Sequence, residues 1–208
     1  MPRVLITGFE KFAGAQSNPT EEMLIGFSYS DAIVKTRVLP VTYASAFSEL
    51  QAEIKEFSPE FILLCGLAEH REQISIEKIG INYINSQIAD NAGEQPLDVK
   101  ISDGGADGHF STFETSTLVS YLQQCQIDSK LSLSAGSYLC NFVLYKTLEM
   151  LKGSSVKVTF VHFPKLSRHA SIKTYQQVLS HLLDYIVQQP SLSEQQIQST
   201  AKSFAAID

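Results

Sequence analysis

The stretch VKVTFVHFP, residues 156–164, decides the fold class because it is mostly a continuous apolar run that ends at a proline. A strand with one face in water alternates apolar and polar residues, whereas a strand covered on both faces reads as apolar nearly throughout. Proline cannot continue the hydrogen bonding of a sheet and marks where the chain leaves it. Residues 156–162 are therefore predicted to form a central strand with His162 at its tip.

In the rest of the chain, other short apolar runs rich in Val and Ile alternate with longer segments of helical period. The predicted strands are residues 4–7, 33–41, 61–65, 131–134 and 156–162. The predicted helices are residues 20–28, 43–57, 112–124, 138–151 and 172–188. This alternation favours an α/β fold in which helices cover both faces of one sheet.

Three further segments complete the prediction along the chain. Residues 74–82 alternate well enough to form another strand, whereas residues 91–108 carry repeated Gly with Asp and Pro and are expected to be loop. After Pro190 the sequence turns to Ser and Gln, which predicts a polar C-terminal helix or tail. We expect a single domain over residues 1–208.

The composition argues against membrane and nucleic-acid partners. Of the 208 residues, 44% are hydrophobic and 18% are charged, and no apolar run approaches the roughly 18 residues that a membrane-spanning helix needs. The formal net charge is -6, without the cluster of Lys and Arg that neutralises phosphates. We expect neither a membrane nor a nucleic acid as partner.

The N-terminus and the cysteines indicate a cytoplasmic chain. MPRVLITGFEKF enters a strand-like run directly, without the features of a secretory signal. Cys65, Cys125 and Cys140 are odd in number and widely spaced, which suggests neither a disulfide framework nor a cysteine-based zinc site. We expect free thiols in a reducing compartment and no metal.

Cys140 is a candidate nucleophile. It lies in SAGSYLCN, where small residues precede a helical pattern. Unpaired N–H groups and the helix dipole at a helix start favour a thiolate, and the same N–H groups can stabilise an oxyanion. The alternative is a buried structural cysteine, since free Cys is among the most buried residue types.

His162 and Glu77 are candidates for the base and for the acid that orients it. An imidazole at the tip of a strand is placed to take the thiol proton, although a backbone carbonyl could equally satisfy it. Glu77 lies between apolar neighbours in ISIEKIGIN, and a buried acid needs a partner. It would fix the imidazole tautomer, unless it faces solvent beside Lys78.

Four ordered blocks of the sequence carry a resemblance to a known family. They are VLITGFEKFAGAQSNP, GLAEHREQISIEKIGIN followed by ADNAG, SAGSYLCN and VHFP, within residues 4–164. Together they resemble the signature blocks of pyroglutamyl peptidase I, a family of cysteine peptidases. Four blocks in order are more specific than any single motif.

The resemblance implies both an activity and a fold. The implied reaction is removal of an N-terminal pyroglutamyl residue from peptides, with Cys140 as nucleophile, His162 as base, Glu77 as acid and no cofactor or metal. The implied fold is a three-layer α/β/α sandwich with a twisted mixed, mostly parallel central sheet. A homo-oligomer, either a dimer or a tetramer, is also implied.

The resemblance further assigns Phe9 and Phe12 to the pocket for the lactam ring; by composition alone both are core residues. Leu67 stands where bacterial members often carry Gln, and Gln87 stands where they carry an Arg proposed to assist near the site. These departures bear on specificity, because all three triad residues are present. Two alternatives remain: a cysteine hydrolase of another N-acyl or lactam substrate, and a catalytically weak homologue that binds blocked N-termini.

Overall fold

The computed structural model describes residues 1–167 and 170–188. Its central feature is a six-stranded sheet, beside which lies a sheet of two strands. The strands are β1 (Arg3–Phe9), β2 (Ile33–Leu39), β3 (Phe61–Leu67), β4 (Ile74–Glu77), β5 (Ile79–Ile81), β6 (Gly108–Phe110), β7 (Ser129–Ser132) and β8 (Lys157–Phe163). The helices are α1 (Pro19–Glu22), α2 (Ala46–Phe57), α3 (Thr115–Gln124), α4 (Leu139–Met150) and α5 (Ile172–Val187).

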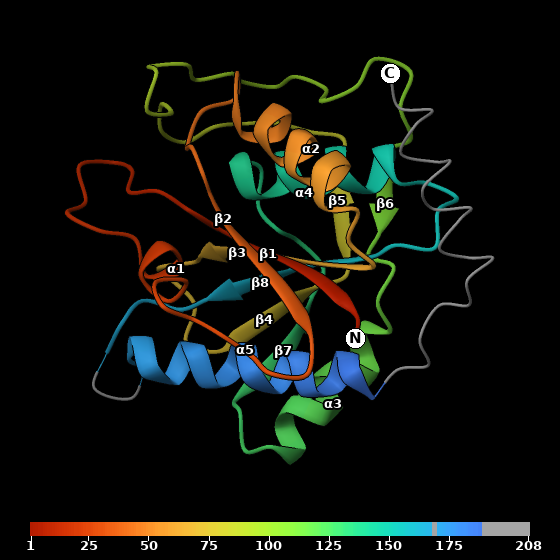
Figure 1. Cartoon of the computed structure of the whole chain (residues 1–208). Helices are drawn as coiled ribbons and strands as arrows, with labels where there is room; N and C mark the ends of the chain where they lie inside the picture. The colour runs from red at the N-terminus through yellow and green to blue at the C-terminus, as the bar shows by residue number, and fades with distance from the viewer. Residues whose placement is uncertain (168–169, 189–208) are drawn as a thin grey trace.

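The sheet is mixed and mostly parallel, as predicted. Its strand order is β2-β1-β3-β8-β4-β7. The first four strands run parallel to one another, β4 runs antiparallel to β8, and β7 runs parallel to β4. In Figure 1, α2 and α4 lie on one side of this sheet and α3 and α5 lie on the other. The prediction of an α/β/α sandwich is therefore confirmed.

Alternate residues of the central strands fill two separate cores, because successive side chains of a strand point to opposite faces. On β8, Val161 and Phe163 pack with α3 and α5, whereas Val158 and Phe160 pack with α2 and α4. His162 falls on the second of these faces, two residues after Phe160. The apolar run of β8 reflects this double coverage.

The predicted strand over residues 74–82 is in fact two strands in two different sheets. β4 ends at Glu77, and β5 pairs with β6 in a small antiparallel sheet. The chain leaves the main sheet at Lys78. The N–H of Lys78 donates to Ser132 O, and the carbonyl of Lys78 accepts a hydrogen bond from Ser111 N. Gly80 then lets α4 approach closely, since a Cβ there would lie 3.0 Å from the backbone of Tyr145.

Several other predictions were wrong in extent. The strand predicted over residues 131–134 is β7, which lies two residues earlier; β2 ends two residues before the predicted end, and α2 and α3 each begin three residues after the predicted start. The helix predicted over residues 20–28 ends at Glu22, and the turns that follow include Gly26 with φ of +67°. The predicted loop over residues 91–108 is mostly irregular, but its last residue begins β6. Side-chain alternation is too short in a three-residue strand to be read from sequence.

The tail predicted after residue 190 lies outside the described residues, and the single domain over residues 1–208 stays a prediction. Within the described ranges, none of the helices has both the length and the apolarity that crossing a bilayer requires.

Candidate active site

Cys140 lies in the first turn of α4, as the sequence predicted. Gly136 has φ of +84°, a conformation that favours glycine, and it allows the sharp turn before the helix. Tyr138 is the extended residue that precedes α4, and Leu139 begins it. Asn141 anchors this turn to β5 because its side chain bonds Ile81 N and Ile81 O, each at 2.9 Å.

The structure brings the thiol of Cys140 to the strand tip that carries His162. Gly66 on β3 is the register partner of His162 on β8, so their side-chain positions share one face of the sheet. A Cβ placed on Gly66 would lie 2.9 Å from Cys140 Sγ. The thiol therefore fills the space above Gly66, next to the strand that holds the imidazole.

Glu77 is buried and bonded to His162, which rules out the solvent-facing alternative for this residue. Its side chain is 0% exposed, and its Oε1 lies 2.7 Å from His162 Nδ1. The antiparallel pairing of β4 with β8 explains this contact, because Ser75 is the register partner of His162 and Glu77 lies two residues further on the same face. The carboxylate therefore fixes which imidazole nitrogen faces the rest of the site.

Arg71 is a member of this cluster that the sequence reasoning missed. Its Nη1 donates to Glu77 Oε1 at 2.6 Å, and its Nη2 donates to the carbonyl of Ser134 at 2.7 Å. The residue lies in the same sequence block as Glu77, six positions earlier. Sequence alone did not reveal that the loop after β3 folds back over the carboxylate.

Burial disfavours the charged forms of both members of the proposed thiol–imidazole pair. Burial raises the pKa of Cys140 to about 12, with a further rise from the negative charge of Glu77 and an opposing effect of Arg71. Burial lowers the pKa of His162, against the opposing effect of Glu77. The helix start favours the thiolate of Cys140, whereas desolvation acts in the opposite direction and raises the pKa of the thiol.

An apolar cavity opens beside the thiol. Its volume is about 60 Å³, which suits a small ring better than an extended side chain. It is lined by Phe9, Phe12, Asn18, Val41, Leu67, Tyr138, Leu139 and Cys140. Both predicted pocket phenylalanines thus contact the cavity, and Phe9 also belongs to the core, being 4% exposed.

The loop that carries Phe12 is held by two asparagines. Asn91 Nδ2 donates to Glu10 Oε1 and to Lys11 O, each at 2.9 Å. Asn18 Nδ2 donates to Glu10 O at 3.0 Å, while Asn18 also caps α1. The amide of Asn18 is thereby engaged, so the cavity walls are chiefly hydrocarbon and aromatic.

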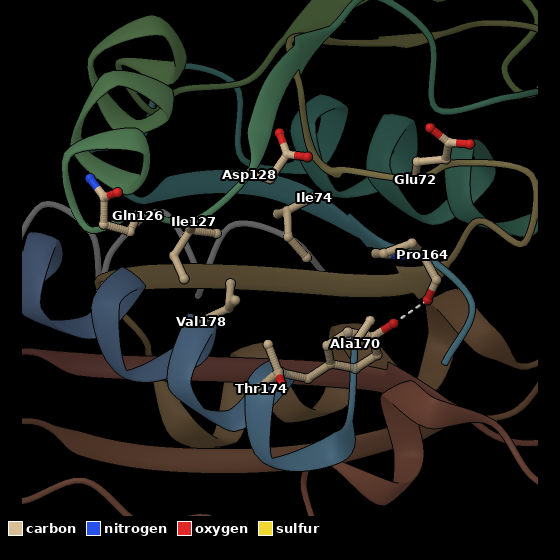
Figure 2. A pocket seen from close by; sticks show the side chains of 10 residues that line it. Glu72, Ile74, Gln126, Ile127, Asp128, Pro164, Ala170, Thr174 and Val178 are labelled. Atoms are coloured by element: carbon tan, nitrogen blue, oxygen red, sulfur yellow. Dashed lines mark hydrogen bonds between the residues drawn. The ribbon is translucent and has the colours of Figure 1, made fainter. Parts of the chain in front are cut away.

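A second hollow lies near the start of α5, and Figure 2 shows its lining side chains. It has a volume of about 200 Å³ and is bordered by Glu72, Asp128, Thr174 and apolar groups. None of the five predicted site residues lines it. Because Cys140 lines the smaller cavity beside the Glu77–His162 pair, that cavity is the candidate active site.

Comparison with known proteins identifies the family of this chain. Residues 2–198 match the family model described as pyroglutamyl peptidase. The chain belongs to the pyroglutamyl peptidase family. It is 39% identical over 169 residues to the pyrrolidone-carboxylate peptidase of Thermococcus litoralis, covering 79% of this chain and 77% of that one. It is 37% identical over 180 residues to pyrrolidone-carboxylate peptidase 1 of Photorhabdus laumondii, covering 82% of each chain.

Solved structures of the pyroglutamyl peptidase family share the fold. The pyrrolidone carboxyl peptidase of Thermococcus litoralis superposes with a TM-score of 0.80 at 34% identity, covering 89% of this chain and 95% of that one. Pyroglutamyl peptidase I of Bacillus amyloliquefaciens gives a TM-score of 0.84 at 24% identity, covering 92% and 99%. The second likeness supports the fold alone.

Of the two departures from bacterial pyroglutamyl peptidases, only Leu67 contacts the cavity. Gln87 is exposed in the segment after β5 and does not line it. That segment still borders the start of α4, because Asn85 N bonds to Ser137 O and Tyr138 donates to Ala89 O at 3.3 Å. The positive charge that contacts the triad cluster comes from Arg71.

Proposed function

We propose that this chain is a cysteine omega-peptidase that removes an N-terminal pyroglutamyl residue from peptides. The single observation that carries the proposal is the position of Cys140, which lines the apolar cavity and lies beside the buried Glu77–His162 pair. Membership of the pyroglutamyl peptidase family supports the same reaction.

Acylation starts from the neutral thiol. His162 accepts the proton of Cys140 as the sulfur attacks the pyroglutamyl carbonyl carbon, and Glu77 stabilises the resulting imidazolium. Unpaired N–H groups at the start of α4 are placed to stabilise the oxyanion. The imidazolium then gives its proton to the departing amine, the peptide bond breaks, and a thioester remains on Cys140.

Deacylation uses the same base. His162 takes a proton from water as the oxygen attacks the thioester carbonyl, the C–S bond breaks, and the sulfur regains its proton. The products are free pyroglutamate and a peptide shortened by one residue. Atoms and charges balance without a metal or organic cofactor.

The substrate ring is proposed to occupy the apolar cavity. A lactam is uncharged and flat, so Phe9, Phe12 and Tyr138 can bury its faces without desolvating a charge. Main-chain groups would bind its amide, since the side chain of Asn18 is already engaged. A free N-terminal glutamate, which carries two charges, would be rejected.

The test is release of a fluorophore from a pyroglutamyl-linked substrate by the whole chain. Wild type is expected to be active, insensitive to a chelator and inhibited by thiol reagents, whereas Cys140→Ala is expected to be inactive. The matched control is Cys125→Ala, which alters another thiol and leaves the site untouched. Activity that survives in Cys140→Ala would overturn the proposal.

One observation favours a second candidate, a cysteine hydrolase that prefers another N-acyl or lactam group. Leu67 makes the cavity wall hydrocarbon where the resemblance leads us to expect an amide. A panel of ring-bearing acyl groups on one reporter would separate the candidates. A wide margin for pyroglutamyl would eliminate this second candidate.

We also propose that the protein is cytoplasmic and forms a homo-oligomer. Both statements follow from the sequence analysis and from the family resemblance. Light scattering coupled to gel filtration measures the oligomeric state directly, and a monomer at micromolar concentration would contradict it.

A further inference from the structure

Arg71 links two parts of the candidate active site. Its two terminal nitrogens donate to Glu77 Oε1 at 2.6 Å and to Ser134 O at 2.7 Å. Ser134 belongs to the turn between β7 and α4, so the guanidinium spans the acid and the segment that leads to Cys140. The planar fork of Arg suits such a two-point contact better than the single ammonium of Lys.

The contact on Glu77 is unusual because one oxygen receives both donors. Oε1 lies 2.6 Å from Arg71 Nη1 and 2.7 Å from His162 Nδ1. The other oxygen, Oε2, is buried and has no hydrogen-bond partner in the described part of the chain. Arg71 is therefore the side chain besides His162 that holds this carboxylate in its orientation.

We propose that Arg71 is a positioning residue that acts through Glu77, keeping the carboxylate aimed at His162 Nδ1 so that Nε2 stays free to take the thiol proton. This inference rests on the proposed function, because it assigns Arg71 a part in the same reaction. Arg71 itself does not contact the substrate in this proposal.

The chemistry behind this role is a choice between two tautomers. An ionised carboxylate can only accept, so it selects the Nδ1–H form of the neutral imidazole and leaves a lone pair on Nε2. Without a carboxylate aimed at Nδ1, this contact no longer selects against the Nε2–H form. That form cannot act as the base toward Cys140 through Nε2.

Three titratable or charged side chains face Glu77 from the elements around it in the described part of the chain. Arg71 faces it from the loop after β3, His162 from β8 and Cys140 from α4. Its register partner on β7 is Ser132, which is uncharged. The adjacent Lys78 lies over the ring of Phe110 and does not contact the carboxylate. The guanidinium is thus the permanent cation in contact with Glu77.

The decisive experiment reads the tautomer of His162 directly. Wild type and Arg71→Met are labelled with ¹⁵N, and the imidazole nitrogens are observed by NMR between pH 7 and 8. We expect the Nδ1–H form in wild type and a shift toward the Nε2–H form in Arg71→Met. A purely structural role would leave the tautomer unchanged in a variant that still folds.

Kinetics on the pyroglutamyl substrate provide the second readout. Loss of a group that orients a catalytic residue typically costs about 10- to 100-fold, and we expect this loss in kcat with KM within about threefold. The acid limb of the kcat/KM profile should move to higher pH in Arg71→Met, because the guanidinium lowers the pKa of His162 and its loss lets the imidazole bind a proton more readily. Arg71→Lys should recover part of kcat, and guanidinium ion in the assay should partly rescue Arg71→Ala.

Two controls separate this proposal from the proposed function. Arg37→Met removes a surface arginine paired with Glu49 at 2.7 Å and is expected to leave kcat and the pH profile unchanged. If Cys140→Ala is inactive while Arg71→Met keeps the wild-type tautomer, kcat and pH profile, the role of Arg71 is refuted and the function stands. If Arg71→Met does not fold, Arg71→Lys with an unaltered pH profile and kcat gives the same refutation.

Discussion

Gly66 and Cys140 share one small space, since a Cβ placed on Gly66 would lie 2.9 Å from Cys140 Sγ. The same Cβ would lie 2.7 Å from the ring of Phe160. Gly66 is also the register partner of His162. Because Gly66 has no side chain, the thiol of Cys140 can lie against β3, next to the strand that carries His162.

Gly66→Ala is therefore expected to lower kcat as well as the free energy of unfolding. Overpacking of a core position costs about 1–3 kcal/mol, whereas displacement of the thiol by about an ångström costs roughly 100-fold in kcat. Steady-state kinetics and urea unfolding measure the two effects. The matched control is Gly108→Ala, whose Cβ would meet Ile79 Cδ1 at 2.9 Å, far from the thiol in sequence and in another sheet. Equal kinetic losses in both variants would contradict the explanation.

The raised pKa of Cys140 predicts a distinct alkylation profile. Because burial raises the pKa of this thiol to about 12, the thiolate fraction grows about tenfold per pH unit below that value. Iodoacetamide modification of Cys140, followed by peptide mapping, should be slow at pH 7 and rise without levelling through pH 10. The partly exposed Cys125 serves as the internal reference. A plateau beginning below pH 8 would instead indicate a preformed thiolate–imidazolium pair.

Phe9 and Phe12 should separate stability from substrate binding. Phe9 is 4% exposed and belongs to the core under α2 and α4, so Phe9→Ala is expected to cost about 3–5 kcal/mol of unfolding free energy. Phe12 is only partly buried, so Phe12→Ala should mainly raise KM, by about tenfold for a loss of about 1.4 kcal/mol of binding. Urea unfolding and steady-state kinetics on both variants test this division. A large stability loss in Phe12→Ala would show that it is a core residue, as composition alone suggested.

The fold was predictable where an apolar pattern continues over many consecutive residues. The doubly covered run that became β8 and the helical period that became α4 were read correctly to within a residue or two. The break at Lys78 was not, because it depends on hydrogen bonds to Ser132 and Ser111 from distant parts of the chain. Short elements such as β6 carry too few residues to show a period.

The site was predictable in its members but not in its electrostatics. Cys140, His162 and Glu77 follow from ordered blocks, and their local contexts suggested a strand tip and a helix start. The surroundings of Cys140 could not be read from its neighbours in sequence, because Gly66 approaches the thiol from β3 and the charge of Glu77 acts on it from β4. The contact of Arg71 with Glu77 could not be predicted for the same reason, because only the folded loop after β3 brings the two residues together.

Leu67 offers a test of how the cavity reads its ring. With a hydrocarbon side chain on this wall and the amide of Asn18 already engaged, wild type should distinguish a lactam from a cyclopentane ring through main-chain groups alone. Leu67→Gln adds an amide that can bond the lactam and would be left unpaired beside cyclopentane, which costs about 1–3 kcal/mol. The ratio of kcat/KM for pyroglutamyl over cyclopentanecarbonyl on the same reporter should therefore rise about tenfold or more in the variant. Leu67→Met, which keeps the wall apolar, should leave the ratio unchanged. If the ratio is equal in wild type and Leu67→Gln, the side chain at this position does not contact the ring, and the specificity must be set by Phe12 and the main chain.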